Sequence, residues 1–463
     1  MNNTKIAFLL ITIMTISCTN KNPNNKRFTG AKGEVKLMTI DPGHFHAALV
    51  QKMMYNQVSP LVQIYAPEGS DVSDHLNRIK GFNSREENPT TWKTKVYTGD
   101  DFLQKMIEEK AGNLMVTSGN NRKKTEYIKT AVDAGINVLA DKPMVIDQSD
   151  FELLKEAFKI AEKNNVLLYD IMTERHEINS ILQKELSMIP EIFGVLSEGS
   201  LDNPAVTKES VHHFFKYVSG NKIKRPAWFF DVTQEGDGIV DVTTHLVDLI
   251  QWECFPGQII DYTKDIEMLS AKRWTTELKP SQFKTVTRLE EYPEYLKKDI
   301  KDSILNVFCN GEMNYKIKGV HAKVSVIWNY QAPEGTGDTH YSIMRGSKSN
   351  LIIRQGAEQN YKTTLYIEPI DLENLEEFET RLTNNFNKIT ETYPGTELKK
   401  NENNWELVVP DKYKIGHEAH FIQVTKKYLQ YLVDGKLPEW EVPNMIAKYY
   451  TTTKALEFAK QNH

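Results

Sequence analysis

Short apolar runs alternate with helical patterns over the first third of this chain, and this order restricts the fold more than any other feature. The apolar runs occupy residues 35–40, 61–65, 114–117, 138–140 and 166–169. Helical patterns lie between them, including 47–54, 125–134 and 151–162. The last has a capping box, Ser149 with Glu152 three residues later. Strands separated by helices are typical of a doubly wound parallel sheet, which we predict for residues 33–170.

The sequence pattern changes at about residue 171. Polar and apolar residues alternate over 313–318 and 322–328, as in antiparallel strands with one solvated face. Asn310-Gly311, between Cys309 and Glu312, predicts a tight hairpin turn. Helical patterns return at 371–390, 418–432 and 445–460. Because 463 residues exceed one typical core, we predict a second, α+β domain over 171–463 with a large, mostly antiparallel open sheet.

The N-terminus has the features of an export signal. Lys5 precedes an apolar run of 11 residues, 6–16, which is too short to span a bilayer but suits a signal peptide. Ser17-Cys18 and a polar stretch follow, an order similar to a bacterial lipoprotein processing site. We predict a signal peptide at 1–17, a polar tether at 18–32 and lipid attachment at Cys18. The protein would then be exported, as a periplasmic or outer-membrane-anchored lipoprotein; the alternative is a plain secretory signal.

Composition narrows the class of protein. Hydrophobic residues make up 40% of the chain and charged residues 26%, as in soluble globular proteins. The net charge of -5 and the lack of an arginine-rich stripe argue against nucleic acid as a partner. After Cys18 only Cys254 and Cys309 remain, which is no disulfide framework. We expect a membrane contact only through the lipid anchor.

The turn after the first strand is a candidate cofactor site. The run 35–40 leads directly into Asp41-Pro42-Gly43-His44-Phe45-His46. A dinucleotide pyrophosphate normally lies at such a turn, where the usual pattern is G-x-G-x-x-G. Here only Gly43 remains, while Asp41 and His46 take the other two glycine positions. His44 and His46 offer donors to a phosphate, but Asp41 would repel one unless it is turned away or neutralised; the alternative is a tight structural turn.

Other polar residues at strand ends extend this candidate site. Glu68 lies 25 residues past Gly43, near where an acidic group binds ribose hydroxyls. Ser118, Asn120 and Asn121 follow the run 114–117, and the carboxyl ends of such strands face the ligand crevice. The alternative for Glu68 is an ordinary loop carboxylate, and the alternative for the asparagines is a turn in which one of them caps a helix.

A lysine, an aspartate and a histidine are candidate catalytic residues. Lys142 follows an apolar strand and precedes Pro143, which biases it away from helix. Its ammonium group can hold a substrate oxygen. Asp241 and His245 are four residues apart, which on a helix places them on one face about 6 Å apart. His245 suits general-base work near neutrality. The alternative for Lys142 is a surface lysine in a turn. The alternative for Asp241 and His245 is an ordinary helix surface on which the histidine has its hydrogen bonds satisfied.

Together, residues 134–143 and 236–248 resemble two elements of the Gfo/Idh/MocA oxidoreductase family, AGKHVxxEKP and GGGxLxDxGxHxxD. The resemblance covers about 33–355 and implies a Rossmann domain followed by a substrate domain. It implies that Lys142, Asp241 and His245 are the three catalytic residues. All three would contact the substrate, and Lys142 would also contact the cofactor. His176, in the first segment of the second domain, is a further substrate candidate. The role of 356–463 stays open.

These observations predict an NAD(P)-dependent oxidoreductase that transfers hydride to or from a carbohydrate or polyol carbon. Free nicotinamide cofactor is scarce outside the cytoplasm, so we expect NAD or NADP to be tightly bound. Two alternatives remain. One is an NAD-dependent glycoside hydrolase or epimerase that recycles its cofactor internally. The other is a non-catalytic sugar-binding module on a decayed dehydrogenase scaffold, which Asp41 favours.

Two further expectations concern metals and assembly. His417 and His420 are spaced to share a helix face, but no third ligand is apparent near them in the sequence. We therefore expect no metal site. The open C-terminal sheet is a candidate surface for a homo-oligomer.

Overall fold

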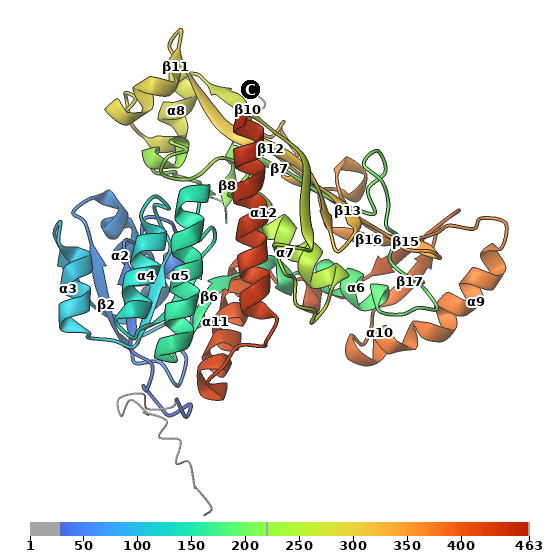
Figure 1. The fold of residues 1–463 in the computed structure, drawn as a ribbon, viewed down its shortest axis with the longest axis horizontal. Helices are drawn as coiled ribbons and strands as arrows, with labels where there is room; N and C mark the ends of the chain where they lie inside the picture. Colours follow the sequence, from blue (N-terminus) through green and yellow to red (C-terminus); the bar gives the residue numbers. More distant parts are fainter. Residues whose placement is uncertain (1–27, 219–220, 462–463) are drawn as a thin grey trace, which may run out of the picture.

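The computed structural model describes residues 28–218 and 221–461 (Figure 1). The predicted signal peptide and Cys18 lie outside these residues, so export and lipid attachment stay predictions. Within the described ranges, no helix combines the length and the apolar character needed to cross a bilayer.

The N-terminal part is a doubly wound sheet of six parallel strands in the order β3-β2-β1-β4-β5-β6, as predicted. Its strands are β1 (Leu37–Ile40), β2 (Leu61–Ala66), β3 (Lys93–Thr98), β4 (Leu114–Thr117), β5 (Asn137–Asp141) and β6 (Leu168–Ile171). Its helices are α1 (His46–Leu49), α2 (Ser70–Ser84), α3 (Phe102–Glu109), α4 (Lys124–Asp133) and α5 (Gln148–Asn164). The strand order reverses between β1 and β4, so the ligand crevice of such sheets opens at the carboxyl ends of these strands.

Two local predictions for this domain are wrong in detail, and one strand, β3, was not predicted. Edge strand β3 has mostly exposed side chains and therefore lacks the apolar run of a buried strand. Helix α1 has only four residues, although the pattern predicted a helix over 47–54. Helix α5 is capped by Asp147, whose carboxylate accepts the Asp150 amide N–H at 3.0 Å. Ser149 instead donates its hydroxyl proton to Asp147.

The second sheet has ten strands in the order β10-β12-β13-β7-β14-β15-β16-β18-β17, with β11 beside β12. Only β13 and β7 pair in parallel, so the mostly antiparallel sheet is confirmed. Its strands are β7 (Val206–Phe215), β10 (Ile266–Leu278), β11 (Ile300–Lys301), β12 (Ile304–Ile317), β13 (Val320–Gln331), β14 (Thr339–Arg345), β15 (Ser349–Gln355), β16 (Thr364–Pro369), β17 (Glu397–Lys400) and β18 (Trp405–Val408). A separate two-stranded ribbon joins β8 (Tyr217–Val218) to β9 (Asn221–Lys222).

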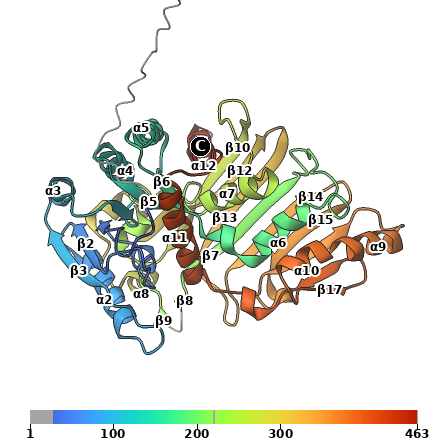
Figure 2. The ribbon, with the colours of Figure 1, turned by 90° about the horizontal axis from the view of Figure 1, so that it is seen from below.

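Helices cover one face of this sheet (Figure 2). They are α6 (Ile178–Ser187), α7 (Thr243–Cys254), α9 (Leu375–Asn385) and α10 (Asn387–Thr392), while α8 (Pro280–Thr287) lies near the β10 and β12 end. Short 3-10 turns are η1 (Thr173–His176), η2 (Ala227–Phe230), η3 (Glu294–Asp299), η4 (Ala357–Gln359) and η5 (Asp411–Tyr413).

The hairpin predicted at 309–312 is wrong, because β12 continues through these residues. The β12–β13 turn lies instead at Lys318-Gly319. Gly311 is needed for packing rather than for a turn, since a Cβ there would lie 2.6 Å from the Cβ of Ile239. The amide N–H of Gly238 donates to the carbonyl of Phe308 at 3.0 Å. These contacts hold the segment that precedes α7 against the sheet.

The last two helices pack against both domains. They are α11 (His417–Asp434) and α12 (Glu441–Gln461), and they lie between the two sheets (Figures 1 and 2). Tyr428 and Leu432 belong to the core of the first sheet, whereas Ala455 and Leu456 belong to that of the second. The role left open for 356–463 is therefore twofold: it adds β16, β17 and β18 to the sheet and joins the two domains.

Candidate active site

Lys142 and Asp241 meet across the boundary between the domains, as the sequence predicted. Lys142 directly follows β5, and its peptide bond to Pro143 is cis. Its Nζ lies 2.5 Å from Asp241 Oδ1, and the two side chains are only 10% and 9% exposed. Burial alone would lower the pKa of Lys142, but the Asp241 and Asp141 carboxylates outweigh burial and raise it. The ammonium group therefore stays charged at neutral pH.

His245 lies near this pair, but it does not share a helix with Asp241. Helix α7 begins at Thr243, so the predicted helix is wrong at its N-terminal end. The residues before it form turns in which the Asp241 amide donates to Asp237 O at 3.1 Å. Nδ1 of His245 is buried and has no hydrogen-bond partner within 28–218 and 221–461. Burial, and then the charge of Lys142, lowers the pKa of this imidazole to about 3.

A second cluster lies beside Lys142 at the ends of β1, β4 and β5. His46 Nδ1 is 2.9 Å from Asp141 Oδ2, and His44 Nδ1 is 3.7 Å from the same oxygen. The Ser118 hydroxyl donates to this oxygen at 2.7 Å. Burial lowers the pKa of both histidines, so both imidazoles are neutral near pH 7. His44, His46 and Ser118, predicted to contact a cofactor, thus contact one another through Asp141.

The β1 turn buries Asp41 and gives its carboxyl group a hydrogen-bond donor, but Asp41 still lines the cavity beside the turn. This residue adopts a φ of 45° and accepts a hydrogen bond from the Tyr127 hydroxyl at 3.2 Å. Burial raises its pKa to about 6, so the carboxyl group is still mostly charged at pH 7 and loses its charge only below about pH 6. The turn amides are already used, since Gly43 N–H donates to Asp41 O and His44 N–H to Ser118 O. The turn therefore offers a phosphate fewer free amide donors than a glycine-rich loop.

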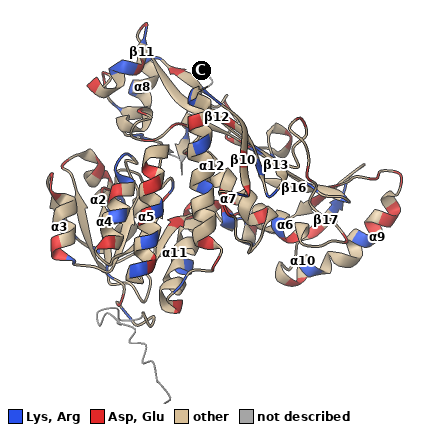
Figure 3. Ribbon diagram, in the orientation of Figure 1, with Lys and Arg blue, Asp and Glu red and all other residues tan. Residues whose placement is uncertain are grey.

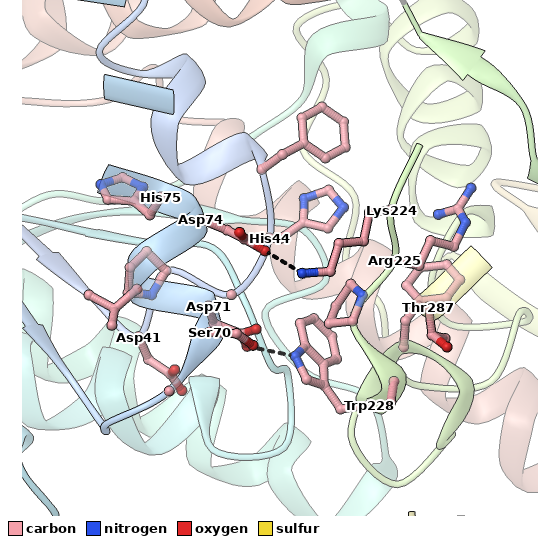
Figure 4. Close-up of a pocket in the computed structure, with 18 of the residues that line it drawn as sticks. Asp41, His44, Ser70, Asp71, Asp74, His75, Lys224, Arg225, Trp228 and Thr287 are labelled. Carbon is pink, nitrogen blue, oxygen red and sulfur yellow. Dashed lines mark hydrogen bonds and ion pairs between the residues drawn. The ribbon is translucent and has the colours of Figure 1, made fainter. Parts of the chain in front are cut away.

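A cavity of about 510 Å³ opens beside this turn, between the first domain and residues 223–229 of the second (Figure 4). Gly43, His44 and Glu68, which we predict to contact a cofactor, line it. Two contacts bridge its walls: Trp228 Nε1 donates to Asp71 at 2.8 Å, and Lys224 pairs with Asp74 at 3.0 Å. The cavity lies where a Rossmann domain holds the adenosine half of a dinucleotide.

Asn120 and Asn121, also predicted to contact the cofactor, form hydrogen bonds with other protein groups. The Asn120 side chain donates to the Gln234 side chain at 2.6 Å, and the Asn121 side chain to the Glu235 carbonyl at 2.7 Å. They join the end of β4 to the segment that carries Asp241. His176 lies in η1, where burial, and then the charges of Lys427 and His420, lower its pKa to about 4.

Sequence reasoning missed Glu174 and did not connect it with His417. Glu174 lies in η1, and its carboxylate is 3.4 Å from His417 Nδ1 at the start of α11. The His417 ring lies 5.4 Å from that of His46, between centroids. Burial alone would raise the pKa of Glu174, but His417 holds it well below the usual range. No local pattern links positions so far apart; only the packing of α11 against η1 does.

Charges of both signs are distributed over the helices of both domains (Figure 3). This agrees with the small net charge of -5. The acidic and basic side chains that gather at the domain boundary are therefore a local feature of the site.

Comparisons with known proteins match this architecture. Residues 182–460 match a family model described as "Putative oxidoreductase C terminal domain". A solved "putative oxidoreductase" from Parabacteroides merdae is 59% identical, with 95% of this chain and 100% of that chain covered and a TM-score of 0.93. A comparison with curated proteins finds no match.

Two more distant structures share the fold. A levoglucosan dehydrogenase in complex with NADH is 10% identical, with 92% of this chain and 97% of that chain covered and a TM-score of 0.58. A biliverdin reductase from Synechocystis, in complex with biliverdin and NADP+, is 12% identical, with 92% and 99% covered and a TM-score of 0.54.

Proposed function

The chain belongs to the Gfo/Idh/MocA family of oxidoreductases, and on this premise we propose that it transfers hydride between a nicotinamide dinucleotide and a carbohydrate or polyol carbon. The observation that carries the proposal is the buried contact of Lys142 with Asp241, with His245 on the adjacent helix. Family membership favours an enzyme over the non-catalytic sugar-binding module. The levoglucosan dehydrogenase relative supports the choice of a sugar-like substrate.

The cavity residues fit a dinucleotide at its adenosine end. A side chain at Gly43 would place its Cβ 2.8 Å from Asp71 Oδ2 and 3.0 Å from Trp228, so only glycine leaves this wall open. Glu68 would hold the ribose hydroxyls, and Arg78 and Lys224 would face the phosphates. His44 and Lys142 would border the nicotinamide end.

Each of the three site residues has one task in the proposed reaction. A bound nicotinamide supplies the hydride acceptor or donor. The Lys142 ammonium group would hold the substrate oxygen and stabilise negative charge that develops there. Neutral His245 would accept the hydroxyl proton. Asp241 would fix the direction of the Lys142 side chain through their contact.

The first experiment is to identify the bound cofactor and then measure turnover. We expect native mass spectrometry of the purified protein to show one nicotinamide dinucleotide per chain. We expect absorbance at the NADH band to change when sugars or polyols are added. Cleavage of aryl glycosides without net NADH would instead establish the internally recycled reaction. Absence of any dinucleotide binding on titration would refute the proposal.

The pH profile tests the proton acceptor. Because burial and Lys142 lower the pKa of His245 to about 3, the imidazole stays an unprotonated base down to weakly acidic pH. We expect kcat/KM for substrate oxidation to lack an acid limb with an apparent pKa near the ordinary histidine value of about 6.5. The measurement is kcat/KM from about pH 5 to 8. A limb near 6.5 that disappears in His245→Gln would contradict the assigned environment of His245.

A further inference from the structure

We propose that His44, His46 and Asp141 form a binding site for a divalent transition-metal ion of the Zn²⁺ class, with an open coordination position toward Lys142. Their ligand atoms all lie within 4.8 Å of one another. Two imidazoles and one carboxylate are a common ligand set for such ions, with water or substrate in the remaining position.

The spacing of these atoms suits a common ion. Bonds of about 2.1 Å place the ligands of a tetrahedral Zn²⁺ roughly 3.4 Å apart. The two observed separations from Asp141 Oδ2, 2.9 Å to His46 Nδ1 and 3.7 Å to His44 Nδ1, lie on either side of this value. Small side-chain rotations would therefore complete the geometry.

His44 Nδ1 and Asp141 Oδ2 face each other without a proton between them. At 3.7 Å they are too far apart for a hydrogen bond. His44 Nδ1 instead accepts a long hydrogen bond from the His46 amide, at 3.4 Å, so this nitrogen carries a lone pair. Two facing acceptor atoms are stabilised by a cation that both can bind. The Ser118 hydroxyl, which donates to Asp141 Oδ2, would orient the carboxylate as an outer-shell partner.

There is room for the ion and its open position. A void of about 20 Å³ borders the three residues, and a single water needs about 10–15 Å³. Its other walls include the carboxyl groups of Asp241 and Glu235 and the ammonium groups of Lys142 and Lys124. Asp141 and Asp241 place carboxylates beside the void, whereas burial raises the pKa of Glu235 well above its usual range, so Glu235 adds little negative charge.

Metal binding is the test, because it requires no assumption about turnover. Protein stripped with a chelator would be titrated with Zn²⁺ by calorimetry, and we expect one ion per chain. We expect His44→Ala, His46→Gln and Asp141→Asn each to weaken binding by at least about 10-fold. Glutamine at position 46 keeps a donor for Asp141, so a loss there reports lost ligation. The matched control is His321→Ala on β13, which should bind as the wild type does.

Two outcomes would overturn the site. One is wild-type protein without saturable Zn²⁺ binding. The other is any of the three variants, folded by circular dichroism, that binds within 10-fold of the wild type. The wild-type protein loaded with Cu²⁺ gives an answer even if a variant does not fold. Electron spin-echo modulation should show the remote nitrogens of two imidazoles; fewer than two would also reject the proposal.

Discussion

Replacing Lys142 by methionine is expected to lower kcat/KM for sugar oxidation by about 1,000-fold, the loss typical of removing a donor aimed at developing negative charge. Methionine keeps the length and apolar stem of lysine, so packing at the end of β5 should persist. The substitution also leaves the Asp241 carboxylate, only 9% exposed, without the ammonium group 2.5 Å away. An unpaired carboxylate there would repel the negative charge that forms on the substrate oxygen. Steady-state kinetics with saturating cofactor measure the effect.

Two variants make this result specific. Lys129→Met replaces a half-buried lysine on α4 that is outside the site, with its Nζ 3.7 Å from Glu156, and should change kcat/KM by less than about twofold. In the double variant Lys142→Met/Asp241→Asn, we expect a combined loss smaller than the product of the single losses, because contacting residues are not independent. A Lys142→Met enzyme that keeps more than a tenth of its activity would remove Lys142 from the proposed mechanism.

Local sequence patterns predicted the strands of the fold well where the burial of a strand determines the spacing of its apolar residues. The runs that became β1, β2, β4, β5 and β6 are apolar because both faces of a parallel sheet are covered. Edge strand β3 has no such run because its side chains are mostly exposed. Asn310-Gly311 carries a local turn signal, yet contact with Ile239 keeps these residues inside β12. Tertiary packing therefore overrode the local preference at that point.

The candidate site could be predicted only in part. Two motifs brought Lys142 and Asp241 together, because a strand end and a glycine-rich turn can be read locally. The approach of His417 to Glu174 and His46 depends on α11 folding back onto the first domain, and no spacing in the sequence encodes that. The same holds for the contact of His44 and His46 with Asp141, which requires β1 and β5 to be in one sheet with only β4 between them.

A buried network of charges joins the domains behind the site. The Arg175 guanidinium donates to Asp248 at 2.7 Å and to Glu441 at 3.0 Å. Lys448 lies 2.6 Å from Asp170 and 2.8 Å from Asp248. None of these five side chains is more than 4% exposed. The network links η1, α7, α12 and β6, so it holds the helix that carries His245 to the first sheet.

Arg175→Met is expected to lower the free energy of unfolding by about 3–5 kcal/mol, because breaking a buried ion pair leaves uncompensated charge. Denaturation followed by tryptophan fluorescence measures the loss. Lys264→Met, which removes an exposed pair with Asp261, should change the free energy of unfolding far less than Arg175→Met does. A loss below about 1 kcal/mol for Arg175→Met would show that the network is not needed for stability.

The pH dependence of stability follows from the same charges. Burial alone would raise the pKa of Asp248, but Arg175 and Lys448 outweigh burial and hold it well below the usual range. A carboxyl group with a lowered folded-state pKa stabilises the protein fully above its unfolded value of about 3.9. This contribution disappears as the pH falls from there through the folded-state pKa. We expect Arg175→Met to lose less stability than the wild type over this acidic range. An equal loss in both proteins would mean that Arg175 does not lower the pKa of Asp248.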